Sequence, residues 1–128
     1  MIGYTTVGTN DLAKSASFYD TVFAVLGAKR VMDFGEFIVW SIKKEDPGFS
    51  ITKPFNKEAA TVGNGNMIAL SAPDRATVDK LYETALAAGG TCEGKPGIRG
   101  DDGSGFYAAY FRDLDGNKLN VFNVSSAD

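Results

Sequence analysis

The sequence predicts an α+β protein built from two βαβββ modules, and two observations lead to this fold class. The segment at residues 11–27, DLAKSASFYDTVFAVLG, recurs at residues 74–90 as DRATVDKLYETALAAGG, with identical or similar residues at a constant offset. One strand-like run precedes each copy, and further strand-like runs follow it. Internal similarity at a fixed offset indicates a duplicated structural unit.

Both copies of the repeat are predicted to be helices. Each opens at an aspartate, Asp11 or Asp74, a residue type that caps helix N-termini. Apolar residues then recur at helical spacing and give each helix one buried face. Gly27, Gly89 and Gly90 are expected to end the helices, because glycine adopts the left-handed C-terminal conformation without steric cost.

Module one is predicted to contain four strands and one helix. The first strand covers residues 2–9, in which side chains alternate as in a strand with one buried face. Three further strands follow the helix, and a glycine turn joins the first two of them into a hairpin. We expect these strands at residues 28–34, 36–42 and 49–52.

Module two is predicted to repeat this order. A strand at residues 66–72 precedes the second helix, and strands follow it at residues 91–93, 106–112 and 118–124. Residues 94–105 form a glycine-rich loop, which is either a mobile lid or a solvated connection. Residues 113–117, DLDGN, form the hairpin turn between the last two strands.

The whole chain, residues 1–128, is predicted to be a single domain. Module one covers about residues 1–54, a linker about residues 55–64, and module two about residues 65–128. A chain of 128 residues with 44% hydrophobic residues can bury one compact core.

Composition excludes several classes of partner. The net charge of −3, with interspersed signs, argues against a nucleic-acid surface, which needs a basic face. No run is long enough to cross a bilayer, and the N-terminus lacks a basic segment followed by an apolar core. We therefore expect no nucleic-acid or membrane partner and a cytoplasmic location. Cys92 is the only cysteine, so no intrachain disulfide is expected.

The chain contains no histidine. This absence excludes Ser-His-Asp and Cys-His catalysis, imidazole acid-base catalysis and every histidine metal site. Carboxylates remain available at Asp33, Glu36, Asp113 and Asp115, but all four flank predicted turns, where acidic residues are usually solvated. No catalytic residue is identified from the sequence.

Several segments of the sequence carry a family resemblance when taken together: the two helix starts NDLA and PDRA, the FYD and LYE within those helices, the strand NMIALS, and the near-terminal FRDLDGNKL. In this order they resemble the vicinal oxygen chelate superfamily, which includes glyoxalase I, extradiol dioxygenases, and fosfomycin and bleomycin resistance proteins. The resemblance covers essentially the whole chain, although Leu114 stands where the family turn usually has proline. It implies that each module is a curved mixed sheet with one helix, and that the protein is a homodimer.

In metal-dependent members of this family, four ligands project into a cavity between the curved sheets. The resemblance places those ligand positions on Tyr4, Ser50, Met67 and Asn120. None of these residues is an imidazole or a carboxylate, which divalent metals prefer. We therefore predict no metal and no cofactor. With Phe122, and with Trp40 or Tyr107 as further wall residues, the four would line a partly aromatic small-molecule pocket.

Three hypotheses for function remain open. The leading one is metal-free binding of a small, partly aromatic ligand, similar to the drug-sequestering resistance proteins of the superfamily. An alternative is a lyase, isomerase or dioxygenase of the glyoxalase type, which would need a metal held by residues other than these four. The third is a structural or partner-binding domain whose cavity is filled by core side chains. Fold alone does not choose among them.

Overall fold

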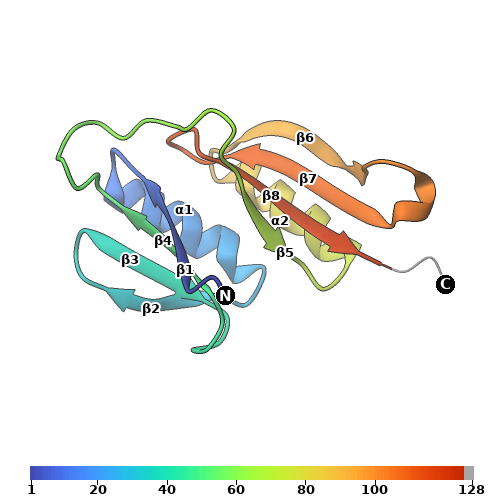
Figure 1. Ribbon diagram of the computed structural model, residues 1–128, viewed down its shortest axis with the longest axis horizontal. Helices are drawn as coiled ribbons and strands as arrows, with labels where there is room; N and C mark the ends of the chain where they lie inside the picture. Colours follow the sequence, from blue (N-terminus) through green and yellow to red (C-terminus); the bar gives the residue numbers. More distant parts are fainter. Residues whose placement is uncertain (126–128) are drawn as a thin grey trace.

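The computed structural model of the protein describes residues 1–125 and arranges them as two modules side by side (Figure 1). In module one, helix α1 (Leu12–Ala24) is accompanied by strands β1 (Tyr4–Gly8), β2 (Lys29–Asp33), β3 (Phe37–Ser41) and β4 (Gly48–Thr52). In module two, helix α2 (Arg75–Ala87) is accompanied by β5 (Ile68–Ser71), β6 (Thr91–Ile98), β7 (Phe106–Arg112) and β8 (Lys118–Val124), with a short 3-10 helix, η1 (Asp102–Ser104), before β7. The predicted order of elements is confirmed.

The four strands of each module form one mixed sheet, and the two sheets share one topology. Their strand orders are β1-β4-β3-β2 and β5-β8-β7-β6. The pairs β1–β4 and β5–β8 are parallel, whereas the other pairs are antiparallel. The repeat seen in the sequence is thus a duplication of a whole βαβββ unit, with β1 and β5 as equivalent edge strands.

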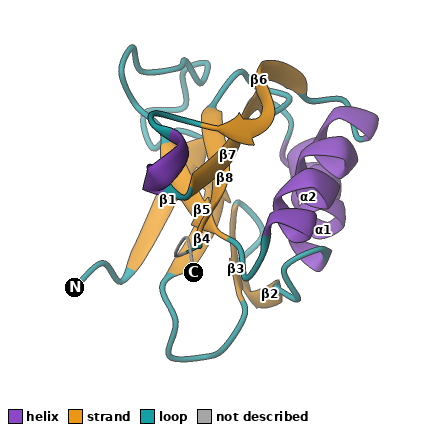
Figure 2. Ribbon diagram, turned by 90° about the vertical axis from the view of Figure 1, so that its right-hand side faces the viewer, coloured by secondary structure: helices purple, strands orange, loops and turns teal. Residues whose placement is uncertain are grey.

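Both helices lie on the same side of the two sheets and contact each other (Figure 2). We call the opposite side of the sheets the open face; it carries Tyr4, Thr6, Ser50, Asn120 and Phe122. Alternation along each strand sends the neighbouring apolar residues to the helices instead. No helix among the described residues is long and apolar enough to span a membrane.

Aspartates cap both helices as the sequence predicts. The carboxylate of Asp11 accepts the backbone N–H of Lys14 at 3.1 Å. The carboxylate of Asp74 accepts the backbone N–H of Thr77 at 2.7 Å. Each cap satisfies a donor that has no partner within the helix and stabilises the fold by about 0.5–2 kcal/mol.

The helix ends follow the predicted glycines, but for two different reasons. Gly27 and Gly89 adopt φ values of 76° and 109°, the left-handed conformation that favours glycine. Gly90 does not adopt this conformation. A Cβ atom there would lie 2.8 Å from the carbonyl oxygen of Arg112, so Gly90 is required by close packing.

The core lies between the helices and the sheets. In module one it is an aromatic cluster of Tyr19, Phe23, Trp40 and Phe49, whose ring centroids lie 4.7–5.9 Å apart. In module two it is mostly aliphatic, and its fully buried members include Val78, Leu81, Ala85, Phe111, Leu119 and Val121. Burying one large apolar side chain contributes about 1.5–3 kcal/mol, so these clusters hold each helix on its sheet.

Strand β6 extends into the segment predicted to be a glycine-rich loop. It continues to Ile98, and its pairing with β7 shifts register between Cys92 and Gly94 and again between Gly94 and Gly97. Such irregularities accommodate glycines within a strand. The prediction of a loop from residue 94 is therefore wrong for residues 94–98, and only residues 99–105 connect the two strands.

The turn between β7 and β8 joins the two modules. The side-chain amide of Asn117 donates to the carbonyl oxygen of Gly8 at the end of β1, at 2.9 Å. The carboxylate of Asp115 accepts the backbone N–H of Asn10 at 2.8 Å. The predicted hairpin turn thus also ties module two to the segment before α1.

Candidate functional site

A hollow of about 510 Å³ lies between β1 and β5, where the two sheets meet. Its walls come from β1, the linker before β5 and the starts of β5 and β8. They include Thr6, Thr61, Asn66, Met67 and Lys118. The volume falls in the range of about 300–1,000 Å³ that is usual for small-molecule sites.

Two of the predicted site residues lie at or behind this hollow. Met67 lines it and is 43% exposed. Ser50 is fully buried behind Thr6: its hydroxyl donates to the carbonyl oxygen of Thr5 at 2.7 Å and lies 2.7 Å from the hydroxyl of Thr6. Because Ser50 is bonded within the protein, Thr6 is the residue that offers a polar group to the hollow.

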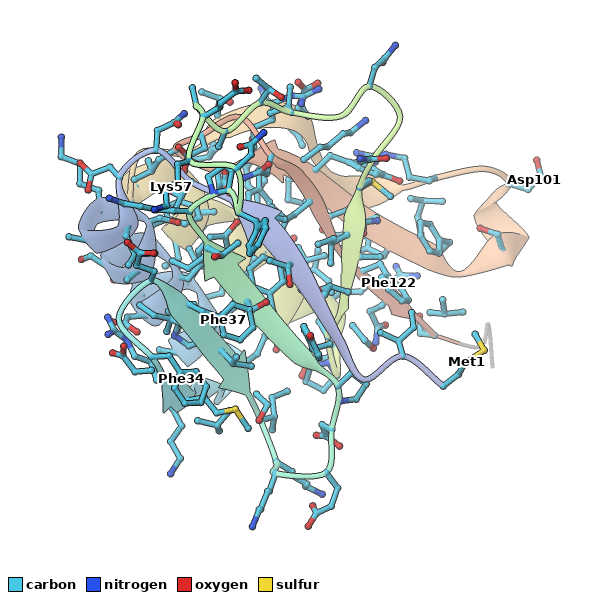
Figure 3. The ribbon with its side chains drawn as sticks, turned by 60° about the vertical axis from the view of Figure 1, so that its left-hand side comes forward. Met1, Phe34, Phe37, Lys57, Asp101 and Phe122 are labelled. Atoms are coloured by element: carbon cyan, nitrogen blue, oxygen red, sulfur yellow. The ribbon has the colours of Figure 1, made fainter. Side chains whose placement is uncertain are left out.

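The other predicted residues of the open face lie on β1, which carries Tyr4, and on β8, which carries Asn120 and Phe122. Figure 3 shows Phe37 and Phe122 on opposite sides of β1 and β5. Tyr4 is 63% exposed and meets the Phe37 ring edge-on, with centroids 6.0 Å apart. Phe122 stacks on Phe106 at 5.4 Å. Asn120 is only 2% exposed, and its Oδ1 has no hydrogen-bond partner among the described residues.

Residues 1–121 match the sequence model of a protein family, the Glyoxalase/Bleomycin resistance protein/Dioxygenase superfamily. The chain belongs to this superfamily. The match spans both modules and confirms the resemblance seen in the sequence. No curated protein matches the sequence.

Solved structures of other superfamily members have the same fold. A glyoxalase/bleomycin resistance protein from Albidiferax ferrireducens T118 is 34% identical, with a TM-score of 0.84 over 96% of this chain and 98% of that chain. A lactoylglutathione lyase from Agrobacterium tumefaciens is 23% identical, with a TM-score of 0.68 over 96% of this chain and 92% of that chain. At 23% identity, the likeness to the lactoylglutathione lyase concerns the fold alone.

Trp40 and Tyr107 do not join the other predicted site residues, because both face the helices. Trp40 is buried in the aromatic core, and its indole N–H donates to Asp20 at 2.9 Å. Tyr107 donates its hydroxyl proton to Asp79 of α2 at 2.6 Å, and this bond raises the pKa of Tyr107. Trp40 instead lines a second, smaller hollow of about 300 Å³ near the end of β5.

The four superfamily ligand positions do not fit a divalent metal in this chain. They offer the phenol of Tyr4, the already bonded hydroxyl of Ser50, the thioether of Met67 and the amide of Asn120. Metals that these folds hold prefer imidazole, carboxylate or thiolate. Within residues 1–125, no three or more Asp, Glu or Cys side chains gather where they could hold an ion.

Two cations that the sequence analysis did not identify approach Tyr110 on the open face. The guanidinium carbon of Arg99 lies 5.4 Å from the ring centre, and the ammonium of Lys118 lies 5.7 Å from it. A third cation, Arg112, pairs with Glu93 and lowers the pKa of that carboxyl through a hydrogen bond. Arg99 could not be found from sequence, because its position depends on β6 extending through the glycines.

Proposed function

We propose that the protein binds a small, partly aromatic molecule in the hollow between β1 and β5 and on the adjoining open face of module two, without a metal. The observation that carries the proposal is the exposure of Met67 in the wall of the hollow. A side chain that only filled a core would be buried. Its thioether offers adaptable apolar surface, and Asn120 and Phe122 add an amide and a ring on the same face.

Ligand binding is tested by thermal shift and by native mass spectrometry. A panel of flat aromatic molecules should contain members that raise the melting temperature, because a ligand that binds only the folded state stabilises it. Mass spectra of protein purified from its own host should show a copurified small molecule. Asn120→Leu should weaken binding by roughly 1–3 kcal/mol, since a polar group of the ligand loses its partner. A panel without any stabilising member overturns the proposal.

Met67→Ala separates an open hollow from a filled one. Because the side chain is substantially exposed, the substitution should change the free energy of unfolding by less than about 1 kcal/mol while weakening ligand binding. A loss of about 2–5 kcal/mol would instead identify Met67 as a core residue and favour the filled-cavity hypothesis. Leu114→Ala is the control, because Leu114 is similarly exposed, at 41%, but lies beside residues of α1 and α2 and not in the hollow.

We propose further that the protein is a homodimer. Module one exposes large apolar side chains around its open face and along β2, among them Tyr4, Met32 and Phe34. Contiguous exposed apolar surface commonly marks a contact between proteins. A second copy of the chain would cover this surface and the free edges of the sheets.

A further inference from the structure

The open face of module two concentrates positive charge in a chain whose net charge is −3. Arg99 follows β6 and Lys118 begins β8, and both reach Tyr110 on β7, the strand between them. Neither cation forms an ion pair with any carboxylate side chain that the structure describes. The nearby carboxylate of Glu93 pairs with Arg112, and Lys118 contributes only its charge to lowering the pKa of Glu93. Both cations can therefore still bind an anion.

The guanidinium of Arg99 is held in place by the backbone of β6. It donates to the carbonyl oxygen of Lys95. A Cβ atom at either Gly94 or Gly97 would come within 3.1 Å of a guanidinium nitrogen, so these glycines leave the space that the group occupies. A guanidinium has five N–H donors, and a single bond to Lys95 leaves others for a ligand. Such a restrained group loses little conformational entropy on binding.

Lys118 and Asn120 connect this charge to the hollow. Lys118 lines the hollow beside Met67. Asn120 is the cross-strand partner of Tyr110, and its buried amide oxygen lacks a partner among the described residues. The charged groups and the unpaired amide thus border one region of the open face.

We infer that the ligand carries an anionic group, a carboxylate or a phosphate, which Arg99 and Lys118 bind beside Tyr110. This inference rests on the proposed function, because it specifies the class of molecule that enters the same site. The remainder of the ligand is apolar or aromatic and extends toward the Phe106–Phe122 stack on the same sheet face. Charge-assisted hydrogen bonds from a guanidinium and an ammonium would supply the recognition.

Calorimetric titration with four naphthalene derivatives tests the charge requirement. 2-Naphthoate and 2-naphthyl phosphate carry the anion, 2-naphthamide is neutral, and 2-naphthylmethylammonium is cationic. We expect at least one anion to bind roughly 10- to 100-fold more tightly than the amide, and the cation to bind most weakly. The tighter of the two anions identifies carboxylate or phosphate as the natural group. Added salt should weaken the binding of the two anions and should not weaken that of the amide.

Variants then assign the effect to the two cations. Lys118→Met and Arg99→Gln should each weaken the binding of the anions roughly 10- to 100-fold and leave the affinity for the amide unchanged. Circular dichroism should show that both variants keep the fold. Lys14→Met on α1 is the control, because Lys14 is exposed and distant from the open face. If the amide binds as tightly as the anions, the inference falls and the proposed function stands. If no derivative binds, both fall.

Discussion

Asp113 is a buried carboxylate whose two oxygens are fully used by its neighbours. One oxygen accepts the backbone N–H groups of Asp115 and Asn117, each at 2.9 Å. The other accepts the Tyr19 hydroxyl at 2.6 Å and the Asn117 side-chain amide at 2.9 Å. A buried charge without such partners costs several kcal/mol. Because Tyr19 belongs to module one, this network also couples the stabilities of the two modules.

Removing the Tyr19 hydroxyl should destabilise the protein in a pH-dependent way. Burial, and then the charge of Asp113, raise the pKa of Tyr19 well above its ordinary value. The tyrosine of the unfolded chain therefore ionises first, near pH 10, and the stability that this group contributes is complete below that pH and lost above it. We expect Tyr19→Phe to lower the free energy of unfolding by about 1–3 kcal/mol at neutral pH.

Urea unfolding at neutral pH and above about pH 10 checks this expectation. The difference between the wild type and Tyr19→Phe should shrink at the higher pH, because the wild type alone loses the contribution of this hydroxyl. Tyr4→Phe is the control, because Tyr4 is 63% exposed and its hydroxyl donates to no carboxylate that the structure describes, so its removal should change the free energy of unfolding little at either pH. A difference that stays constant with pH would contradict the assignment.

The donor atoms at the superfamily ligand positions predict a protein without stoichiometric metal. A thioether, an amide, a phenol and an internally bonded hydroxyl supply neither the charge nor the hard donors that zinc, nickel, iron or manganese require. Elemental analysis should find none of these metals at a stoichiometric level, and a chelator should leave the melting temperature unchanged. One metal per chain would instead favour a glyoxalase-type enzyme with ligands outside this set.

At the scale of elements, periodicity predicts the helices well and the site only in part. The capped helices and the order of strands follow from the repeat itself. The direction in which Trp40 and Tyr107 point depends on which side of each strand the helix covers. Trp40 packs against Tyr19 and Phe23 of α1, and Tyr107 donates a hydrogen bond to Asp79 of α2. The extension of β6 depends on tertiary pairing with β7, which overrides the low strand propensity of glycine.

The two reasons for glycine at helix ends predict different costs of substitution. Gly27→Ala should cost about 1–2 kcal/mol, because the left-handed conformation is strained for alanine while the surrounding space is open. Gly90→Ala should cost about 1–3 kcal/mol, because its Cβ would crowd the backbone oxygens of Arg112 and Ala85.

Urea unfolding of both variants, with Gly3→Ala beside them, measures these costs. Gly3 has no left-handed φ and no heavy atom within 4 Å of an added Cβ, so its substitution should be nearly neutral. Gly27→Asn should recover part of the loss, since asparagine tolerates the left-handed conformation, whereas Gly90→Asn should not. Equal behaviour of the two positions would show that packing and backbone strain have not been separated correctly.

At the scale of the whole molecule, the duplication explains why the fold could be predicted. Because the same sequence pattern occurs twice, each copy strengthens the prediction made from the other. The segment FRDLDGNKL adds the turn that joins the two modules. The placement of the two modules side by side depends on contacts between α1 and α2 and on the buried Tyr19–Asp113 bond. A single sequence does not reveal such pairings, so the hollow between β1 and β5 could be anticipated only through the family resemblance.

The exposed apolar surface of module one predicts that the protein self-associates. Phe34 is 73% exposed and stacks on Phe37 at 6.5 Å, so a partner could cover both rings. We expect sedimentation at micromolar concentration to show a dimer, and Phe34→Asp to shift it toward the monomer, because a carboxylate buried in the interface would lack a partner. The fold should survive, since Phe34 contributes little to the core.

Phe55→Asp is the matched control for this experiment. Phe55 is fully exposed in the linker and is not among the apolar residues proposed to form the contact, so the same change of ring to carboxylate should leave the dimer intact. A protein that sediments as a monomer at every concentration would contradict the dimer directly. If both variants dissociate equally, the effect would come from net charge rather than from the apolar surface, and the contact would have to be sought elsewhere. Selective dissociation by Phe34→Asp would place the second copy over the β2–β3 end of module one, at the sheet edge opposite β1.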